Sequence, residues 1–317
     1  MGYLNSLIAG VVFTAVGVTS AVAADQIRVG KSVGNSLAFT PVDVGIAKGI
    51  WAKYDLEVET QVFGGEAKLQ QALIAKSTDF ALGSGPGMGF LSKGVDAKTI
   101  GAIAYEPLSM GLIAAADHKD AQALKGKRIG VSTPASLSYY LAREFSRQMG
   151  WGNDGITTVP LGALPANVAA LRSGQIDAFV MSSSTGFALE KEGAASVVLD
   201  FGTVIPKFTT HVIFATGEVV RDKPDVVRRF LQGWIESVNF MFENKEETLK
   251  IINPVTGLPD DVASREYDVV MPMMSRDLRF SEENLAPVAK AIEEMGLAAG
   301  PIDMSELYTE EFLPKTQ

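Results

Sequence analysis

Hydroxyl side chains gather around Pro134, and their spacing suits the binding of an anion or a carbonyl oxygen. Ser132, Thr133 and Ser136 lie within five residues, after an apolar run that predicts a buried strand. Thr133 directly precedes Pro134, a pairing typical of a helix N-cap followed by proline at the first helical position. The free N–H groups at such a helix start, including those of Ala135 and Ser136, can donate to a bound anion.

The elements that would position these hydroxyls occur twice in the chain. Residues 64–84 align without gaps on residues 162–182, an offset of 98 (162 − 64). Each copy begins with glycine, continues as a predicted helix, and ends with an aspartate followed by an apolar run that closes on serine. Each copy follows a short apolar strand, so each half predicts a strand–helix–strand unit, and such units build parallel sheets.

Ligands of such sheets bind beyond the carboxyl ends of the strands. The loops expected there are short, polar and rich in hydroxyl groups, and they cover residues 32–35, 84–87, 132–136 and 182–185. Two similar α/β lobes that each offer such a rim predict a ligand held between them.

The N-terminal residues 1–24 carry no charged side chain. An apolar run of about twelve residues is too short to span a bilayer, and Ala21-Val22-Ala23 has the small residues of a cleavage site. We therefore expect residues 1–24 to be a signal peptide. Because the chain has no cysteine for lipid attachment, the mature protein is expected to be periplasmic and monomeric.

Composition excludes several classes of function and sets the expected domains. A net charge of −9 argues against nucleic acid as a partner, and the lack of cysteine excludes disulfides and thiolate metal sites. We expect lobe one to comprise residues 25–110 and 208–317, and lobe two residues 111–207. Two crossings, near residues 107–114 and 205–211, would then form a hinge.

Three segments carry a resemblance to a known family. They are Leu-Lys-Gly-Lys-Arg-Ile-Gly-Val at 124–131, Leu-Arg-Ser-Gly-Gln-Ile-Asp-Ala at 171–178, and Lys-Pro-Asp-Val-Val at 223–227. With the glycine-led helix starts, they resemble the nitrate/taurine/alkanesulfonate-type substrate-binding proteins of ABC importers, a family that includes binders of the thiamine pyrimidine precursor. The resemblance implies a type II periplasmic-binding fold, closure on a small-molecule ligand, and delivery to a membrane permease.

The resemblance also implies which residues line the cleft, with no catalytic residue, metal or cofactor among them. Both lobes contribute: Ser32, Asn35, Phe39, Gly65, Ser84, Gly85, Thr133, Ala135, Ser136, Asn167, Ser182, Ser183 and His211. His211 lies in a predicted strand, where a lone histidine is more often a structural residue than a ligand contact. Ala135 replaces a glycine of many relatives.

The nature of the ligand stays open between two chemistries. Many hydroxyl and backbone donors with few fixed charges suit a small organic anion, such as a sulfonate, nitrate or carboxylate, held by helix N-termini. The aromatic side chain of Phe39 suits a neutral heteroaromatic such as a pyrimidine precursor. A sensor would share these features, and an enzyme on the same fold is a further alternative.

Overall fold

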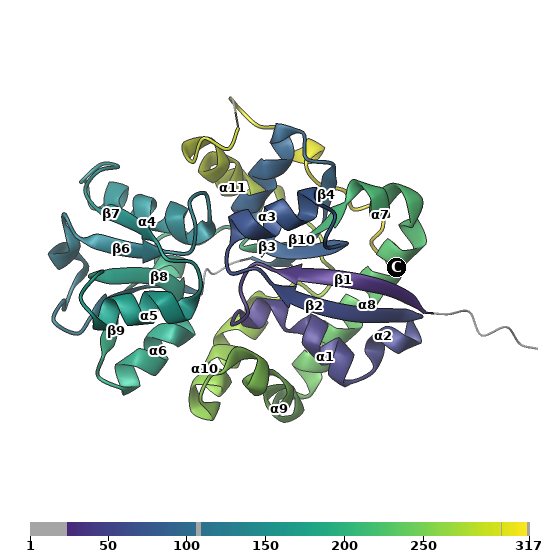
Figure 1. Ribbon diagram of the computed structural model, residues 1–317, viewed down its shortest axis with the longest axis horizontal. Coiled ribbons are helices and arrows are strands. Elements are labelled where there is room, and N and C mark those ends of the chain that lie inside the picture. Colours follow the sequence, from purple (N-terminus) through teal and green to yellow (C-terminus); the bar gives the residue numbers. More distant parts are fainter. Residues whose placement is uncertain (1–23, 106–108, 299, 316–317) are drawn as a thin grey trace, which may run out of the picture.

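The computed structural model describes residues 24–105, 109–298 and 300–315. The predicted signal peptide lies outside the described residues except for Ala24. Two five-stranded sheets, each flanked by helices, lie side by side and form two lobes (Figure 1). Within the described ranges, no helix is long and apolar enough to cross a membrane.

The sheet of lobe one has the strand order β2-β1-β3-β10-β4, in which β10 runs antiparallel to both of its neighbours. Its strands are β1 (Asp25–Lys31), β2 (Leu56–Val62), β3 (Phe80–Ser84), β4 (Ala97–Ala104) and β10 (His211–Thr216). The sheet of lobe two has the order β7-β6-β8-β5-β9, in which β5 is antiparallel to its neighbours. Its strands are β5 (Met110–Ala115), β6 (Arg128–Val131), β7 (Thr157–Pro160), β8 (Ala178–Ser182) and β9 (Ala195–Asp200).

The helices connect these strands and cover both faces of each sheet. The α-helices are α1 (Pro41–Ala47), α2 (Ile50–Lys53), α3 (Glu66–Ile74), α4 (Leu137–Gln148), α5 (Leu164–Arg172), α6 (Ser183–Lys191), α7 (Gly217–Asp222), α8 (Pro224–Glu243), α9 (Lys245–Thr256), α10 (Asp260–Val270) and α11 (Glu282–Glu294). Short 3-10 helices are η1 (Leu37–Phe39), η2 (Gly85–Lys93), η3 (Ala121–Leu124), η4 (Phe201–Thr203), η5 (Met271–Met273) and η6 (Met304–Glu306).

The repeat predicted from the sequence is present in three dimensions. Helix α3 and strand β3 correspond to α5 and β8 with the same offset of 98 residues at every boundary. The aspartate of each copy accepts the backbone N–H of an arginine on the strand that precedes the repeated segment, Asp79 from Arg28 of β1 and Asp177 from Arg128 of β6. The same local interaction therefore joins the two strands in both lobes.

The sheets are mixed, whereas the repeat predicted parallel ones. The repeated strands are parallel, as β1 is to β3 and β6 is to β8. The antiparallel strands are the two that follow a passage between the lobes, β5 after β4 and β10 after β9. A strand that enters from the other lobe arrives at the rim and must run back along its neighbours. The first predicted crossing lies partly outside the described residues, and the hinge stays a prediction.

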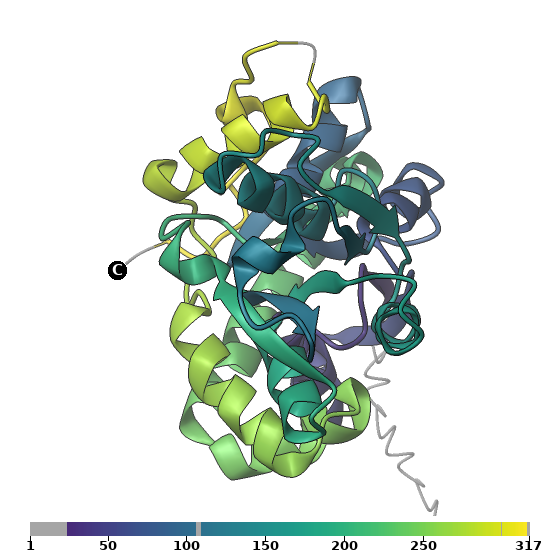
Figure 2. The ribbon, with the colours of Figure 1, turned by 90° about the vertical axis from the view of Figure 1, so that its left-hand side faces the viewer.

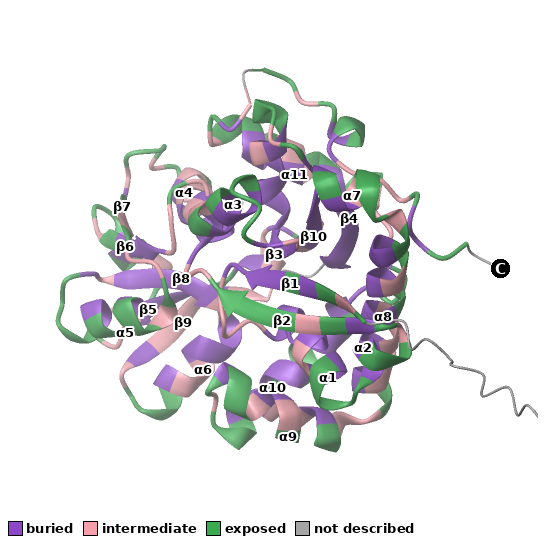
Figure 3. Ribbon diagram, turned by 45° about the vertical axis from the view of Figure 1, so that its right-hand side comes forward, coloured by how far each residue is buried: buried purple, intermediate pink, exposed green. Residues whose placement is uncertain are grey.

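An aromatic cluster anchors α8 beneath the sheet of lobe one. The ring of Phe230 stacks on Phe80 of β3 at a centroid distance of 4.1 Å and on Trp51 of α2 at 5.2 Å. These rings are fully buried, while β2 at the sheet edge is largely exposed (Figure 3). The apolar side chains that recur at helical spacing over residues 227–241 therefore belong to the core of lobe one.

The start of α4 corrects one prediction. Ser136, rather than Thr133, is the N-cap: its Oγ accepts the N–H of Tyr139 at 3.2 Å and donates to the carbonyl of Thr133 at 2.7 Å. Ala135 has a φ of 60°, a left-handed conformation that no residue of a regular α-helix adopts. Pro134 and Ala135 therefore form a turn, and the helix begins at Leu137.

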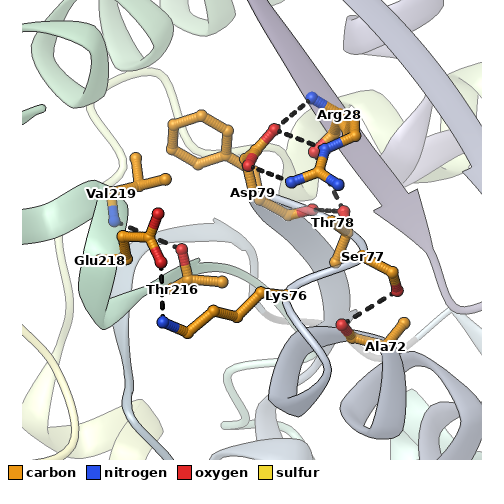
Figure 4. Close-up of polar contacts among 10 residues, drawn as sticks. Arg28, Ala72, Lys76, Ser77, Thr78, Asp79, Thr216, Glu218 and Val219 are labelled. Atoms are coloured by element: carbon orange, nitrogen blue, oxygen red, sulfur yellow. Dashed lines mark hydrogen bonds and ion pairs between the residues drawn. The ribbon is translucent and has the colours of Figure 1, made fainter.

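We predict that Asp79→Ala lowers the free energy of unfolding by about 1–2 kcal/mol, because its carboxylate accepts three hydrogen bonds from Arg28. The pair Lys76–Glu218 lies nearby but is more exposed (Figure 4). Glu218→Gln is the control and should leave stability unchanged. Urea denaturation measures both, and equal effects of the two substitutions would contradict the prediction.

We also predict that Ser136→Ala costs about 0.5–2 kcal/mol of stability in the absence of ligand, because the α4 N-cap is lost. Thr133→Ala should cost less, since the buried Oγ1 of Thr133 has no hydrogen-bond partner among the described residues. Thermal unfolding of both variants compares them. A larger loss in Thr133→Ala would restore Thr133 as the cap.

Candidate functional site

A cleft of about 800 Å³, counting the part open to solvent, lies between the two lobes. Lobe one borders it with the loop after β1, the ends of β3 and β4, the start of β10, and α10. Lobe two borders it with the start of β5, the loop after β6, the start of α4 and the end of β8. The cleft is therefore at the strand ends where the repeat placed it.

Six of the predicted site residues line this cleft. Four are serines, and together the six come from both lobes: Ser32, Asn35, Ser84, Ser136, Ser182 and His211. The serines repeat the symmetry of the sequence, because Ser84 ends β3 and Ser182 ends β8. Ser132, one of the hydroxyl residues noted before Pro134, also lines the cleft. The lining further contains hydroxyl and apolar side chains that sequence reasoning did not select, among them Ser109, Ser138, Leu137, Met110, Met181 and Met273.

Three other predicted residues lie next to the cleft but do not line it. The buried Phe39 lies behind His211, with the ring centroids 5.0 Å apart and the rings perpendicular. Gly65 approaches Thr133 across the lobes so closely that a Cβ on Gly65 would lie 2.6 Å from the Thr133 methyl group. Gly65 and Thr133 therefore form a contact between the two lobes and contribute no polar group to the cleft lining.

The remaining four predicted residues have structural surroundings. The N–H of Gly85 donates to the Thr210 carbonyl, and the Asn167 amide donates to the carbonyls of Gly162 and Ala163. Ala135 forms the turn before α4, and Ser183 is buried with its N–H donating to Ser109. None of these four residues borders the cleft.

Glu66 is a lining residue that sequence reasoning missed. It is 3% exposed at the start of α3, and its carboxylate accepts the N–H of Ser84 and the amide of Gln70, each at 2.9 Å. Burial raises the pKa of Glu66, and these hydrogen bonds oppose the rise. Glycines make room for the carboxylate, since a Cβ on Gly83 or Gly87 would lie 2.6 or 2.3 Å from its Oε1.

Glu266 is a second buried carboxyl in the lining, also 3% exposed. It projects from α10 of lobe one, and its Oε2 has no hydrogen-bond partner among the described residues. Burial raises the pKa of Glu266 to about 7, and the hydroxyl of Ser184 in lobe two opposes this rise. At neutral pH this group is therefore close to half-protonated in the cleft.

Both glutamates left a signal in the sequence. Position 66 of the first copy corresponds to Leu164 of the second (66 + 98), so a charged residue replaces an apolar one at the same helix start. In α10 the buried face comprises Val262, Ala263, Glu266, Tyr267 and Val270. A glutamate within an apolar stripe is rarely fully buried without a reason.

His211 contributes a neutral imidazole to the cleft. Burial lowers its pKa to about 4, and its Nδ1 lies 3.0 Å from the hydroxyl of Thr210. No described lysine or arginine is among the lining residues. Lys31, at the end of β1, is buried and held by both carboxylate oxygens of Asp43, at 2.6 and 2.7 Å from its Nζ. The cleft therefore presents carboxyls, hydroxyls and a neutral histidine.

The lobes contact each other on both sides of the cleft. On one side α6 packs against α10, with Lys191 paired to Asp261 and the guanidinium of Arg265 3.4 Å from the Phe187 ring centroid. On the other side Arg147 of α4 pairs with Glu294 of α11. Figure 2, viewed from lobe two, shows the yellow C-terminal helices above that lobe and light-green α9 and α10 below it.

The described residues contain no cluster of three or more His, Cys, Asp or Glu that could hold a metal ion. The groups that meet in the cleft can accept and donate hydrogen bonds to a ligand. The serines lie beside other hydroxyls, as Ser182 does beside Ser184 and Thr185 at 3.0 and 3.2 Å. This geometry suits recognition of a polar solute between two surfaces.

Known proteins resemble this chain in sequence and in fold. A binding protein of Brucella abortus is 29% identical over 206 residues, 64% of this chain, and the chain spans 63% of the length of that curated relative. The alkanesulfonate-binding protein SsuA of Xanthomonas axonopodis, solved with MOPS, superimposes with a TM-score of 0.75 at 19% identity, covering 91% of this chain and 99% of SsuA. The desulfurization enzyme DszB has a lower TM-score of 0.64 at 16% identity, covering 91% and 97%.

These superpositions establish the fold as that of the periplasmic binding proteins, in agreement with the expected fold class. The family model described as NMT1/THI5 like matches residues 36–248, which is more than half of the sequence. With its two lobes and the cleft between them, the chain belongs to the NMT1/THI5-like family.

Proposed function

We propose that the chain is the periplasmic receptor of an ABC importer and that it captures a small solute bearing N–H groups, such as an amine or an amino-substituted heteroaromatic. The family and the inter-lobe cleft support a receptor. The expected lobes, residues 25–110 with 208–317 and residues 111–207, would close on the solute, and the membrane permease would receive it. No catalytic step is assigned to the cleft.

The observation that carries the choice of ligand is the pair of buried carboxyls, Glu66 and Glu266, in a lining without a described lysine or arginine. Burial raises the pKa of both carboxyls, so an anionic ligand beside them would either add like charge to a desolvated site or require them to be protonated. N–H groups of a ligand would instead satisfy carboxylate oxygens, above all the unpartnered Oε2 of Glu266.

The helix N-termini, which suggested an anion site in the sequence, have a different partner in lobe one. Glu66 is the first residue of α3, so the positive end of that helix already has a carboxylate beside it. The protein's own side chain thus occupies the position that an anionic ligand would take there.

A small organic anion is the second candidate, favoured by lobe two. The starts of α4 and α6 both face the cleft through lining serines, Ser136 and Ser182, and no carboxylate lies in the first turn of either helix. A sulfonate or carboxylate held there would be stabilised by the helix ends. The likeness to SsuA agrees with this candidate at the level of fold.

A thermal-shift screen of the mature protein separates the two candidates. The panel is butylamine, 4-aminopyrimidine, propanesulfonate and taurine, which carries an amine and a sulfonate. Compounds with N–H groups should stabilise the protein, by about 2.7 kcal/mol at 100 times the dissociation constant. Stabilisation by propanesulfonate alone would replace the first candidate with the second.

The variant Glu66→Gln tests the role of the carboxylate itself. Loss of a charged hydrogen-bond acceptor should weaken the binding of a nitrogen base by roughly 10- to 100-fold. The new amide can donate to Oε1 of Gln70, which is buried without a partner, so the fold should persist. Calorimetry measures the affinity, and Glu59→Gln on exposed β2 is the control. Unchanged binding by Glu66→Gln would contradict the assigned role.

A further inference from the structure

Glu266 lies at the junction of three parts of the molecule. Its helix α10 belongs to the C-terminal segment that follows β10, and its carboxyl lines the cleft. The side chain of Ser184, on α6 of lobe two, is near enough to lower the pKa of this carboxyl. Ser184 in turn lies 3.0 Å, hydroxyl to hydroxyl, from Ser182 in the cleft lining. Figure 3 shows α6 and α10 side by side, and their contact is one of those that join the lobes.

The charged groups around Glu266 have other partners or are exposed. On α6, Lys191 pairs with Asp261, and Glu190 accepts the N–H of Val197. The elements η1 and η5 carry no ionisable side chain. On α10, the hydroxyl of the buried Tyr267 donates to the carbonyl of Met241. The remaining ionisable groups on α10 and on the adjoining α9 are paired elsewhere, stacked on a ring or exposed: Asp260, Arg265 and Asp268, and Lys245, Glu246, Glu247 and Lys250.

Within the cleft itself, the other titratable groups are Glu66 and His211. Glu66 has its own donors, Gln70 and Ser84, and His211 is neutral at neutral pH because burial lowers its pKa to about 4. No described cation therefore pairs with Glu266, and its Oε2 is left without a partner when α6 and α10 are in contact.

We propose that Glu266 is a specificity-determining residue that makes closure of the lobes depend on a ligand N–H group. The inference rests on the proposed function, because it assumes that the lobes close on a solute. Contact between α6 and α10 removes the carboxyl from water, and an ionised carboxylate with an unsatisfied oxygen opposes that contact. A ligand N–H group that donates to Oε2 removes this cost of closure, and protonation of the carboxylate removes it as well.

The direction of the pH dependence follows. Burial raises the pKa of Glu266 to about 7 in the closed form, whereas a hydrated carboxyl in an open form has an ordinary value near 4.3. The closed form without ligand thus binds the extra proton. Its population is favoured at low pH and declines as the pH rises through about 7.

The experiment measures closure directly in the ligand-free protein. Because the chain has no cysteine, spin labels can be placed at Lys68→Cys in lobe one and Lys125→Cys in lobe two, both exposed. Pulsed EPR distances report the ratio of closed to open forms. This ratio should fall by about tenfold or more between about pH 5.5 and about pH 8.5. In Glu266→Gln it should be the same at both pH values.

Two further variants test whether the pH dependence of closure comes from Glu266. Asp261→Asn also removes a contact between α10 and α6, its pair with Lys191, but should retain the pH dependence. Ser184→Ala removes the hydroxyl group that opposes the pKa rise of Glu266, so the pH transition should move to higher pH. This second variant also tests the proposal if Glu266→Gln does not fold.

Absence of a pH dependence in the parent protein, or its persistence in Glu266→Gln, would overturn the proposal. Adding 4-aminopyrimidine or butylamine at about pH 8.5 should raise the closed population in the parent and leave it nearly unchanged in Glu266→Gln. If neither compound raises the closed population of the parent, the ligand class of the proposed function is wrong. The ligand-free titration of Glu266→Gln still decides separately whether this residue governs closure.

Discussion

A buried carboxylate needs compensation from the protein around it, and this requirement organises the cleft. Glu66 receives it from the N–H of Ser84, the amide of Gln70 and the N-terminal end of α3. The space for its oxygens exists because residues 83 and 87 are glycines. Together these groups tie the start of α3, the end of β3 and the start of η2 to one buried carboxyl in the cleft lining.

Glu266 lacks equivalent compensation, and the contrast between the two carboxyls is informative. Oε2 of Glu266 has no partner in the described structure, and the hydroxyl that lowers the pKa of this carboxyl, that of Ser184, belongs to the other lobe. The hydrogen-bond donors to the Glu66 carboxylate, Gln70 and Ser84, both belong to lobe one. A hydrogen-bond partner for Oε2 of Glu266 would have to come from the other lobe or from a molecule between the lobes.

The two lobes share a backbone plan but differ in the chemistry of their rims. The same helix start carries Glu66 in lobe one and Leu164 in lobe two, while the strand ends keep their serines, Ser84 and Ser182. Lobe one therefore brings acidic groups to the cleft and lobe two mainly hydroxyls and a methionine-rich apolar surface. A ligand between them meets two unlike surfaces despite the internal repeat.

The sequence by itself determined the elements that are encoded locally. The repeat of residues 64–84 at 162–182, the strand at Arg128–Val131 and the amphipathic helices follow from periodicity and turn residues, and the fold class followed from the family resemblance. The serines at strand ends reached the cleft because strand ends of repeated units share a rim.

Only the tertiary structure decided that β5 and β10 run antiparallel, since this depends on where the chain re-enters each sheet. It also decided which residue caps α4, since Ala135 adopts a left-handed turn that delays the helix start. Above all it placed Glu66 and Glu266 at one cleft, because burial and the convergence of distant segments are properties of packing rather than of local sequence.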